Sequence, residues 1–168
     1  MLRARDIPFC VIGAAAMAVH GVARSTQDVD LLVVSPETLD PATWEPLRRD
    51  GISVIPHPGD VTDPLRGVVR VRTTSPPPVD VIVGKARWQA AVLERARMAS
   101  IEGVDVPVAR TADLVLLKLY AGGPQDAWDV TQLLEGPDRS GLVAEVERGL
   151  ADLPDDSRAL WRRIVAGG

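Results

Sequence analysis

The sequence predicts an α/β chain, a small mixed sheet flanked by helices and followed by a helical lobe. Five short apolar runs, mostly β-branched, lie within the first 83 residues, and glycine, proline or aspartate separates them. Such runs are typical of strands in a sheet. From about residue 111 the apolar residues recur at helical spacing instead. We therefore expect a core of residues 1–110 and a C-terminal helical lobe of residues 111–168 packed on it.

In the first half of the chain, the pattern predicts strands that alternate with helices. Residues 9–12 form a short apolar run, and the small residues at 14–20 favour a helix that Gly21 ends. The run at 29–34 is typical of a central strand, and a helix is expected over 41–49, where Gly51 stops it. Further strands are expected at residues 52–55, 68–71 and 79–83.

The second half reads as mainly helical. A helix over 88–97 is expected to lead into a hairpin over 100–108 that turns at Gly103. Thr111 is a good N-cap for the apolar helix at 114–120, and Pro124 opens a helix whose apolar side chains share one face. Two more helices are expected, at 142–150 and 158–165.

The composition excludes several classes of protein. Apolar residues make up 46% of the 168 residues and charged residues 25%, as in ordinary globular chains. The longest apolar runs fall far short of the ~20 residues that cross a bilayer, which rules out a membrane span. The net charge of −4 argues against a protein that coats nucleic acid. Because the only cysteine, Cys10, reads as a buried thiol and no secretory leader is evident, we expect a cytoplasmic protein.

Two aspartates at the start of the expected central strand are the most informative feature. Asp28 and Asp30 are two residues apart, so in a strand their side chains point to one face. Neighbouring carboxylates repel each other unless a cation lies between them, and hard oxygen ligands suit Mg²⁺ or Mn²⁺. Asp80 interrupts another apolar strand, so a metal site of three carboxylates forms if the strands are neighbours. Alternatively, Asp28 caps a turn and Asp80 only follows a loop.

Gly13, Arg24 and one group of arginines suggest weaker hypotheses. A glycine between a strand and a helix lets the backbone approach a phosphate, although turn geometry alone also explains it. Arg24 could contact a triphosphate or form a surface ion pair. Arg70 and Arg72 share one strand parity with Arg66, and we interpret them as a solvated face.

Residues 12–16 (IGAAA) and 20–31 (HGVARSTQDVDL) resemble the signature of the nucleotidyltransferase superfamily related to DNA polymerase beta. The most similar branch is that of the minimal and AbiEii-like toxin nucleotidyltransferases. This resemblance implies a mixed-sheet catalytic core in which Asp28 and Asp30 bind metal. It also implies that Asp80 is the third carboxylate, which activates the acceptor hydroxyl, and that Gly13 and Ala14 form the nucleotide-binding turn together with Arg24.

The resemblance extends to residues 116–130, which carry a lysine on one helix and two aspartates on the next. Lys118 is then a candidate to neutralise nucleotide phosphate. Asp126 and Asp129 share one helix face, so one of them could orient Lys118 or the nucleotide. The alternative is structural: Lys118 reaches solvent along an apolar stem, and Asp126 occupies a first-turn position that the helix dipole favours.

The resemblance implies a Mg²⁺-dependent enzyme that moves a nucleoside monophosphate from an NTP to an acceptor hydroxyl and releases pyrophosphate. The acceptor would be an RNA or tRNA end, a protein or a small molecule, and a role as a toxin would bring an antitoxin partner. Two departures from the pattern stand out: Ala14 replaces a second glycine or a serine, and Gln125 replaces an arginine. They keep open the alternative of an inactive binding or regulatory module with the same fold.

Overall fold

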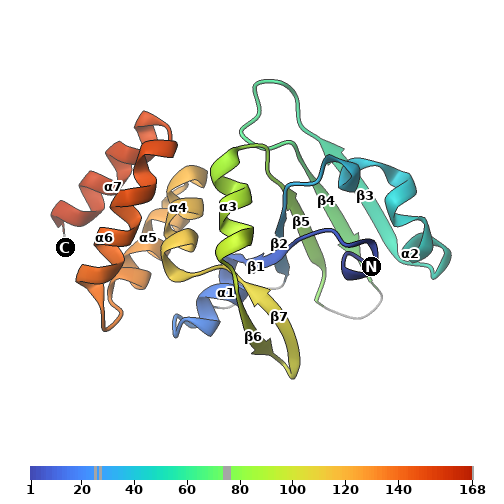
Figure 1. Ribbon diagram of the computed structural model, residues 1–168, viewed down its shortest axis with the longest axis horizontal. Coiled ribbons are helices and arrows are strands. Elements are labelled where there is room, and N and C mark those ends of the chain that lie inside the picture. The colour runs from blue at the N-terminus through green and yellow to red at the C-terminus, as the bar shows by residue number, and fades with distance from the viewer. Residues whose placement is uncertain (25, 27, 74–76, 168) are drawn as a thin grey trace.

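The computed structural model describes residues 1–24, 26, 28–73 and 77–167, and Figure 1 shows its mixed sheet flanked by helices. Strands of the described residues form one sheet in the order β3-β4-β5-β2-β1-β7-β6. Their bounds are β1 (Cys10–Ile12), β2 (Val29–Val33), β3 (Ser53–Pro58), β4 (Gly67–Arg72), β5 (Val79–Val83), β6 (Arg97–Ile101) and β7 (Val104–Val108).

Strand β2 occupies the centre of the sheet. It pairs in parallel with β5 on one side and antiparallel with β1 on the other. Strand β1 is in turn parallel to β7, while the hairpins β3–β4 and β6–β7 and the pair β4–β5 are antiparallel. The two strands that carry the predicted aspartates are therefore direct neighbours.

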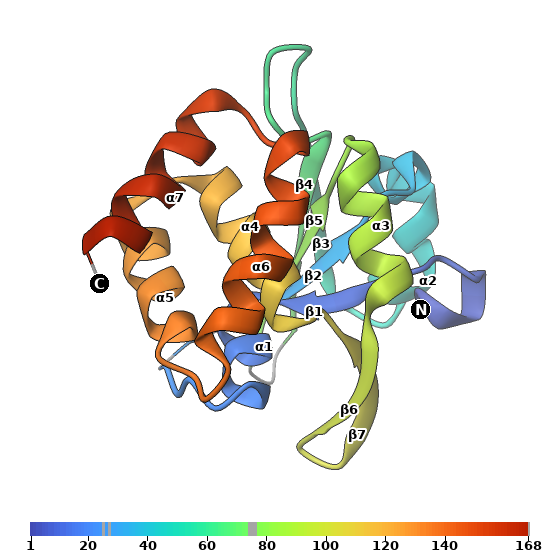
Figure 2. The same cartoon turned by 60° about the vertical axis from the view of Figure 1, so that its left-hand side comes forward.

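Most of the helices lie at the two ends of the molecule. Helices α4 to α7 pack together at one end of the molecule, whereas α2 lies beside β3 at the other end (Figures 1 and 2). None of the described helices is long and apolar enough to span a membrane. The helix bounds are α1 (Gly13–Val19), α2 (Glu45–Arg49), α3 (Arg87–Arg95), α4 (Thr111–Ala121), α5 (Pro124–Leu134), α6 (Arg139–Gly149) and α7 (Asp155–Gly167).

The sheet buries a different core on each face. Successive side chains of a strand point to opposite faces, so Val81 and Val83 join a cluster with Trp44, while Leu32 joins a cluster with residues of α1, α3 and α4. Asp30 and Asp80 have the parity of Leu32 and Ile82. Both aspartates therefore belong to the face of the sheet that α3 and α4 cover.

The predicted fold class is confirmed, although the helix expected over 41–49 is α-helical only over Glu45–Arg49, after a 3₁₀ turn at Pro41–Trp44, and two further errors lie at one boundary. The helix expected over 88–97 ends at Arg95, and the hairpin expected over 100–108 already begins at Arg97. The reason is that Ala96 adopts an extended conformation with ψ 148°, after which β6 pairs with β7 along its whole length. Strand pairing thus outweighs the high helix propensity of Ala96, Arg97 and Met98.

Candidate active site

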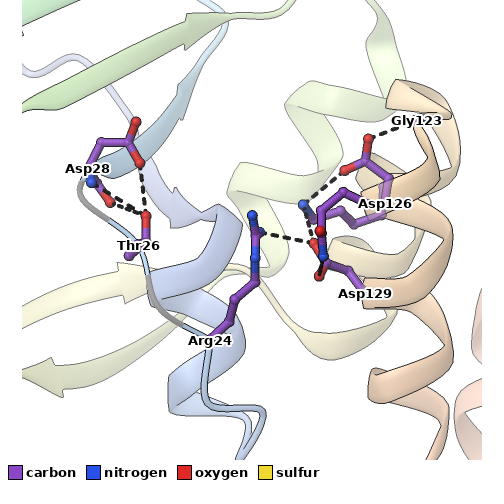
Figure 3. Close-up of polar contacts among 8 residues, drawn as sticks. Arg24, Thr26, Asp28, Gly123, Asp126 and Asp129 are labelled. Carbon is purple, nitrogen blue, oxygen red and sulfur yellow. Dashed lines mark hydrogen bonds and ion pairs between the residues drawn. The ribbon is translucent and has the colours of Figure 1, made fainter.

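The strand register brings two of the predicted carboxylates side by side. Asp30 of β2 and Asp80 of β5 are register partners in a parallel pair, so both side chains leave the same face of the sheet. Asp28 lies just before β2 and is held locally, because the Thr26 hydroxyl donates a 2.8 Å hydrogen bond to its Oδ1 atom (Figure 3). The negative charge of Asp28 also acts on Asp30, whose pKa it raises.

Gly13 leaves room for the carboxylate of Asp30. A Cβ atom on Gly13 would lie 2.0 Å from Asp30 Oδ2, and the φ angle of +63° is one that residues with side chains rarely adopt. The contact follows from the position of strand β1. Its last residue, Ile12, is the antiparallel register partner of Asp30, so Gly13, the next residue, lies beside that aspartate. The glycine is therefore required by close approach as well as by backbone conformation. Ala14, the next residue, is buried and presents no polar group.

Asp30 is the carboxylate with the most perturbed acidity. Its pKa is raised from 3.8 to about 6, first by burial and then by the negative charges of Asp28 and Asp80, while the positive charges of Lys118 and Arg24 act in the opposite direction. Within the described part of the chain, no residue donates a hydrogen bond to its carboxylate. A half-buried carboxylate between like charges, with no donor of its own, has the chemistry of a ligand for a hard divalent cation.

Asp80 is already engaged by two arginines of the neighbouring strand. Arg72 Nη1 lies 2.7 Å from its Oδ1 atom, and Arg70 Nε lies 3.9 Å from its Oδ2 atom. Arg70 is the antiparallel register partner of Asp80, which explains why these two side chains lie side by side. The side chains of Arg70 and Arg72 are 56% and 40% exposed, so they do lie on a solvated face, and the pairing of β4 with β5 in addition places them beside an acidic residue.

The three aspartates do not form a ready metal cluster. Among residues 1–24, 26, 28–73 and 77–167, no three His, Cys, Asp or Glu side chains are gathered closely enough to hold a metal ion. Asp28 accepts a hydrogen bond from Thr26, and Asp80 accepts one from Arg72. In each aspartate, one carboxylate oxygen is therefore already bound to a protein donor. The chemistry of the donor set fits Mg²⁺ or Mn²⁺, with Asp30 as its most available member.

Helices α4 and α5 contribute a second polar group, in which every charge has a partner (Figure 3). Lys118 Nζ lies 2.9 Å from Asp126 Oδ1 and 2.7 Å from Asp129 Oδ2. Arg24 Nη1 lies 3.2 Å from Asp129 Oδ2, and Gln125 Nε2 donates a 3.1 Å hydrogen bond to Asp129 Oδ1. Two cations and two carboxylates thus compensate each other, and Arg24 reaches this group from the loop after α1.

The protonation of Lys118 is secured by this group. Burial alone would lower the pKa of the ammonium, but hydrogen bonds to Asp129 and Asp126 outweigh burial and raise it. Asp126 also accepts a 3.1 Å hydrogen bond from the backbone N–H of Gly123, which fixes the start of α5. Lys118 is therefore a permanent positive charge in a fixed position.

A cavity of about 260 Å³ lies between the carboxylates and this helical group. Asp30 and Gly13 contribute to its wall from the sheet side, and Lys118 and Asp126 from the helical side. The structure thus brings five of the predicted residues to one place, namely Gly13, Asp30, Lys118, Asp126 and, through Asp129, Arg24. Ala14 does not line this cavity, and neither do Asp28 and Asp80.

Sequence reasoning gave too little weight to two residues. Asp129 has no exposed surface and is the common partner of Lys118, Arg24 and Gln125, although Asp126 seemed the stronger candidate. Its spacing carried a signal, because Asp129 lies one turn before the buried Leu133 and so occupies a core-facing position. Arg72 was missed because nothing in the sequence fixes the register of β4 on β5.

Comparisons with known proteins identify the fold. No protein-family model matches the sequence, and a search of curated proteins finds no match. Among solved structures, the chain is similar to an antigenic nucleotidyltransferase-like protein from Paracoccidioides brasiliensis, with 17% identity, a TM-score of 0.52 and coverage of 95% of this chain and 86% of that one. It is also similar to the lincosamide antibiotic adenylyltransferase LnuA, with 10% identity, a TM-score of 0.49 and coverage of 80% and 90%.

The similarity to the Paracoccidioides brasiliensis protein concerns the same fold that the sequence motifs suggested. It extends over nearly the whole chain, so it includes the helices after residue 110 as well as the sheet. At 17% identity it concerns the fold and not the activity. The chain has the nucleotidyltransferase fold.

Proposed function

We propose that this chain is a metal-dependent nucleotidyltransferase that moves a nucleoside monophosphate from an NTP to an acceptor hydroxyl. The observation that supports this best is the state of Asp30, whose carboxylate faces Asp80 in register and has a pKa raised to about 6. A fold without a cation-binding role gains nothing from such a residue. We assign residues 1–110 to the catalytic core and residues 111–168 to the helical lobe.

Asp30 would hold Mg²⁺ or Mn²⁺ together with Asp28 and Asp80. A bound divalent ion would supply positive charge to the phosphates of the nucleotide and lower the pKa of a coordinated hydroxyl. For Asp80 to take part, it must share its oxygens between Arg72 and the ion. The arginine would then orient the carboxylate that Asp80 presents to the reacting groups.

The remaining residues position the substrate and balance its charge. In the reaction, the acceptor oxygen bonds to the α-phosphorus while the bond from that phosphorus to the bridging oxygen breaks, and pyrophosphate leaves. Asp80 would accept the proton of the acceptor hydroxyl. Lys118, held by Asp126 and Asp129, would offset phosphate charge from a fixed position. Gly13, Ala14 and Arg24 would border the nucleotide.

The acceptor is a hydroxyl of a small molecule, a protein or an RNA end. The net charge of −4 favours the first two, since long nucleic acids are bound through many cationic contacts. The resemblance to toxin nucleotidyltransferases makes a toxin with an antitoxin partner one form of this function. Growth arrest on expression of the wild type, and not of an Asp30→Asn variant, would test that form.

A second candidate function is a binding or regulatory module that has kept the fold without turnover. It is favoured by the 2.7 Å ion pair of Asp80 with Arg72, which engages the third carboxylate. Ala14 and Gln125 add to it, because neither supplies the hydroxyl or the charge that the related pattern has. Such a module would bind nucleotide or a partner but would release no pyrophosphate.

Transfer of label from NTPs separates the two candidates. The protein is incubated with each α-³²P-labelled NTP, Mg²⁺ and fractionated cell lysate, and both the labelled fraction and pyrophosphate are measured. We expect transfer by the wild type and by Asp105→Asn, a matched change at an exposed position of strand β7, and none by Asp30→Asn. No transfer by a wild type that still binds Mg²⁺ and nucleotide would establish the module instead.

A further inference from the structure

The face of β3 and β4 that continues the carboxylate side of the sheet is open to solvent. Register partners of an antiparallel pair share a face, so Arg70 lies beside Ile55 and Arg72 beside Ser53. Ile55 and Ser53 are exposed, and so is more than half of the Arg70 side chain. The opposite face of these strands is buried in the cluster that contains Trp44. The described helices therefore leave β3 and β4 uncovered on the side of the aspartates.

This open face carries positive charge in excess. Arg70 and Arg72 share the one carboxylate of Asp80, and Arg72 makes the close contact, at 2.7 Å. The guanidinium of Arg70 lies 3.9 Å from that carboxylate and makes no hydrogen bond to any residue that the structure describes. Neither β3 nor β4 contains an acidic residue. The planar guanidinium of Arg70 is therefore free to bind an oxyanion through two parallel N–H groups.

The order of the strands places Arg70 on the acceptor side of the site. In the order β4-β5-β2-β1, the aspartates of β5 and β2 lie between Arg70 of β4 and Gly13, which follows β1. In phosphoryl transfer, the attacking and leaving oxygens lie roughly in line, on opposite sides of the phosphorus. In the proposed function, pyrophosphate leaves on the side of Gly13 and Lys118. The acceptor oxygen then arrives from the side of β4.

We propose that this face binds a small anionic acceptor, whose phosphate or carboxylate group Arg70 holds while its hydroxyl lies at Asp80. The inference rests on the proposed function and deepens it, because it names the acceptor class. Neighbouring strands lie about 4.8 Å apart, so the oxyanion and the hydroxyl belong to nearby parts of one molecule. The two arginines would repel a cationic acceptor, and a long nucleic acid needs more cationic contacts than these two residues.

Matched probes and variants test the charge of the acceptor. Glycerol 3-phosphate, glycerate, glycerol and 3-amino-1,2-propanediol share a vicinal diol and differ in whether they are negative, neutral or positive. Arg70→Gln removes the charge, Arg70→Lys keeps it, and Arg163→Gln is the control, an equal change at an exposed position of α7. Circular dichroism and thermal unfolding show which variants fold.

Calorimetry at pH 7.5 measures the affinity of each protein for each probe. The titrations are made with Mg²⁺ alone and again with the donor site filled by α,β-methylene analogues of the four NTPs. The affinities for these analogues and for a short RNA trinucleotide are measured separately.

We expect the wild type and Arg163→Gln to bind glycerol 3-phosphate or glycerate saturably. Binding to Arg70→Gln should be roughly tenfold weaker, and Arg70→Lys should recover part of the loss. Glycerol and the aminodiol should bind no better to the wild type than to Arg70→Gln. Equal affinity of the wild type and Arg70→Gln for both anions, or no saturable binding of either anion by the wild type, overturns the proposal.

Two other results would overturn it by giving Arg70 a different ligand. Weaker binding of the NTP analogues by Arg70→Gln would assign the arginine to the phosphates of the donor. Binding of the trinucleotide alone, lost in Arg70→Gln, would assign it to a nucleic-acid backbone. All of these are binding measurements, so loss of the anion site is distinguishable from loss of transferase activity, which the transfer of label measures.

Discussion

The two polar groups that border the cavity differ in how their charges are compensated. On the helical side, Lys118 and Arg24 face Asp126 and Asp129, and each charge has a partner within 3.2 Å. On the sheet side, Asp30 lies near two other carboxylates and has no donor among the described residues. The charges on the helical side balance without a bound ion, whereas the negative charge of Asp30 on the sheet side costs stability until a proton or a cation neutralises it. The helical group therefore holds Lys118 in place, whereas the sheet side has the carboxylate that a cation would neutralise.

Removing the carboxylate that joins the helical group should have the largest effect on stability. Asp129→Ala leaves Lys118 with one carboxylate and Arg24 with none, and breaking a buried ion pair costs roughly 3–5 kcal/mol. Urea unfolding at pH 7 measures the loss. Asp126→Ala is the matched control and should cost less, because Asp126 is partly exposed whereas Asp129 has no exposed surface. Equal losses would mean that Asp129 does not hold the group together.

Gly13→Ala should strain the sheet side. The new Cβ atom would lie 2.0 Å from Asp30 Oδ2 at a positive φ angle, so the carboxylate has to move. We expect a loss of about 1–3 kcal/mol of unfolding free energy and a weaker affinity for Mg²⁺. Ala15→Gly, a change of similar size two residues on in α1, is the control for helix propensity. A Gly13→Ala protein that binds Mg²⁺ like the wild type would show that this contact is not needed.

Asp30→Asn should make the free protein more stable while it removes activity. The substitution takes a half-buried negative charge away from Asp28 and Asp80, so at pH 7 without divalent ions we expect a gain of about 1–2 kcal/mol. A loss of stability in metal-free buffer would instead assign Asp30 a structural role like that of Asp129.

The pH dependence of stability should sharpen the same contrast. Because the folded-state pKa of Asp30 is about 6 instead of 3.8, the native protein holds this proton over a range where the unfolded chain has lost it. Stability contributed by this group is therefore full below about pH 4 and falls as the pH rises to 6. Unfolding curves at pH 4.5, 5.5 and 6.5 should show a wild-type decline that Asp30→Asn lacks. Parallel curves for the two proteins would contradict the raised pKa.

Periodicity made the sheet side predictable. The spacing of two residues placed Asp28 and Asp30 together, and the apolar run around Asp80 marked a strand on which an acidic residue is out of place. That β2 and β5 are neighbours in register is a property of the sheet, which sequence spacing cannot give. The ion pair of Asp80 with Arg72 depends on that same register, and so it was not foreseen.

On the helical side, spacing predicted which residues lie together but not which of them is the most buried and makes the most contacts. Lys118 and Asp126 were expected as candidates, yet the centre of the group is Asp129, because α5 turns that residue to its buried face. The cap of α3 gave no sequence signal at all. Gln89 supplies it by accepting hydrogen bonds from the backbone N–H groups of the two residues before α3. Such a capping position usually follows a serine or threonine three residues earlier, and here that residue is Ala86.

Calorimetric titration of Mg²⁺ into the wild type and into Asp30→Asn at pH 7.5 tests the central claim most directly. The unpaired carboxylate of Asp30 in β2 predicts saturable binding by the wild type, abolished in Asp30→Asn and retained in the Asp105→Asn control. Equal binding by the wild type and Asp30→Asn, or none by either in the presence of an NTP, would contradict a metal centre at Asp30.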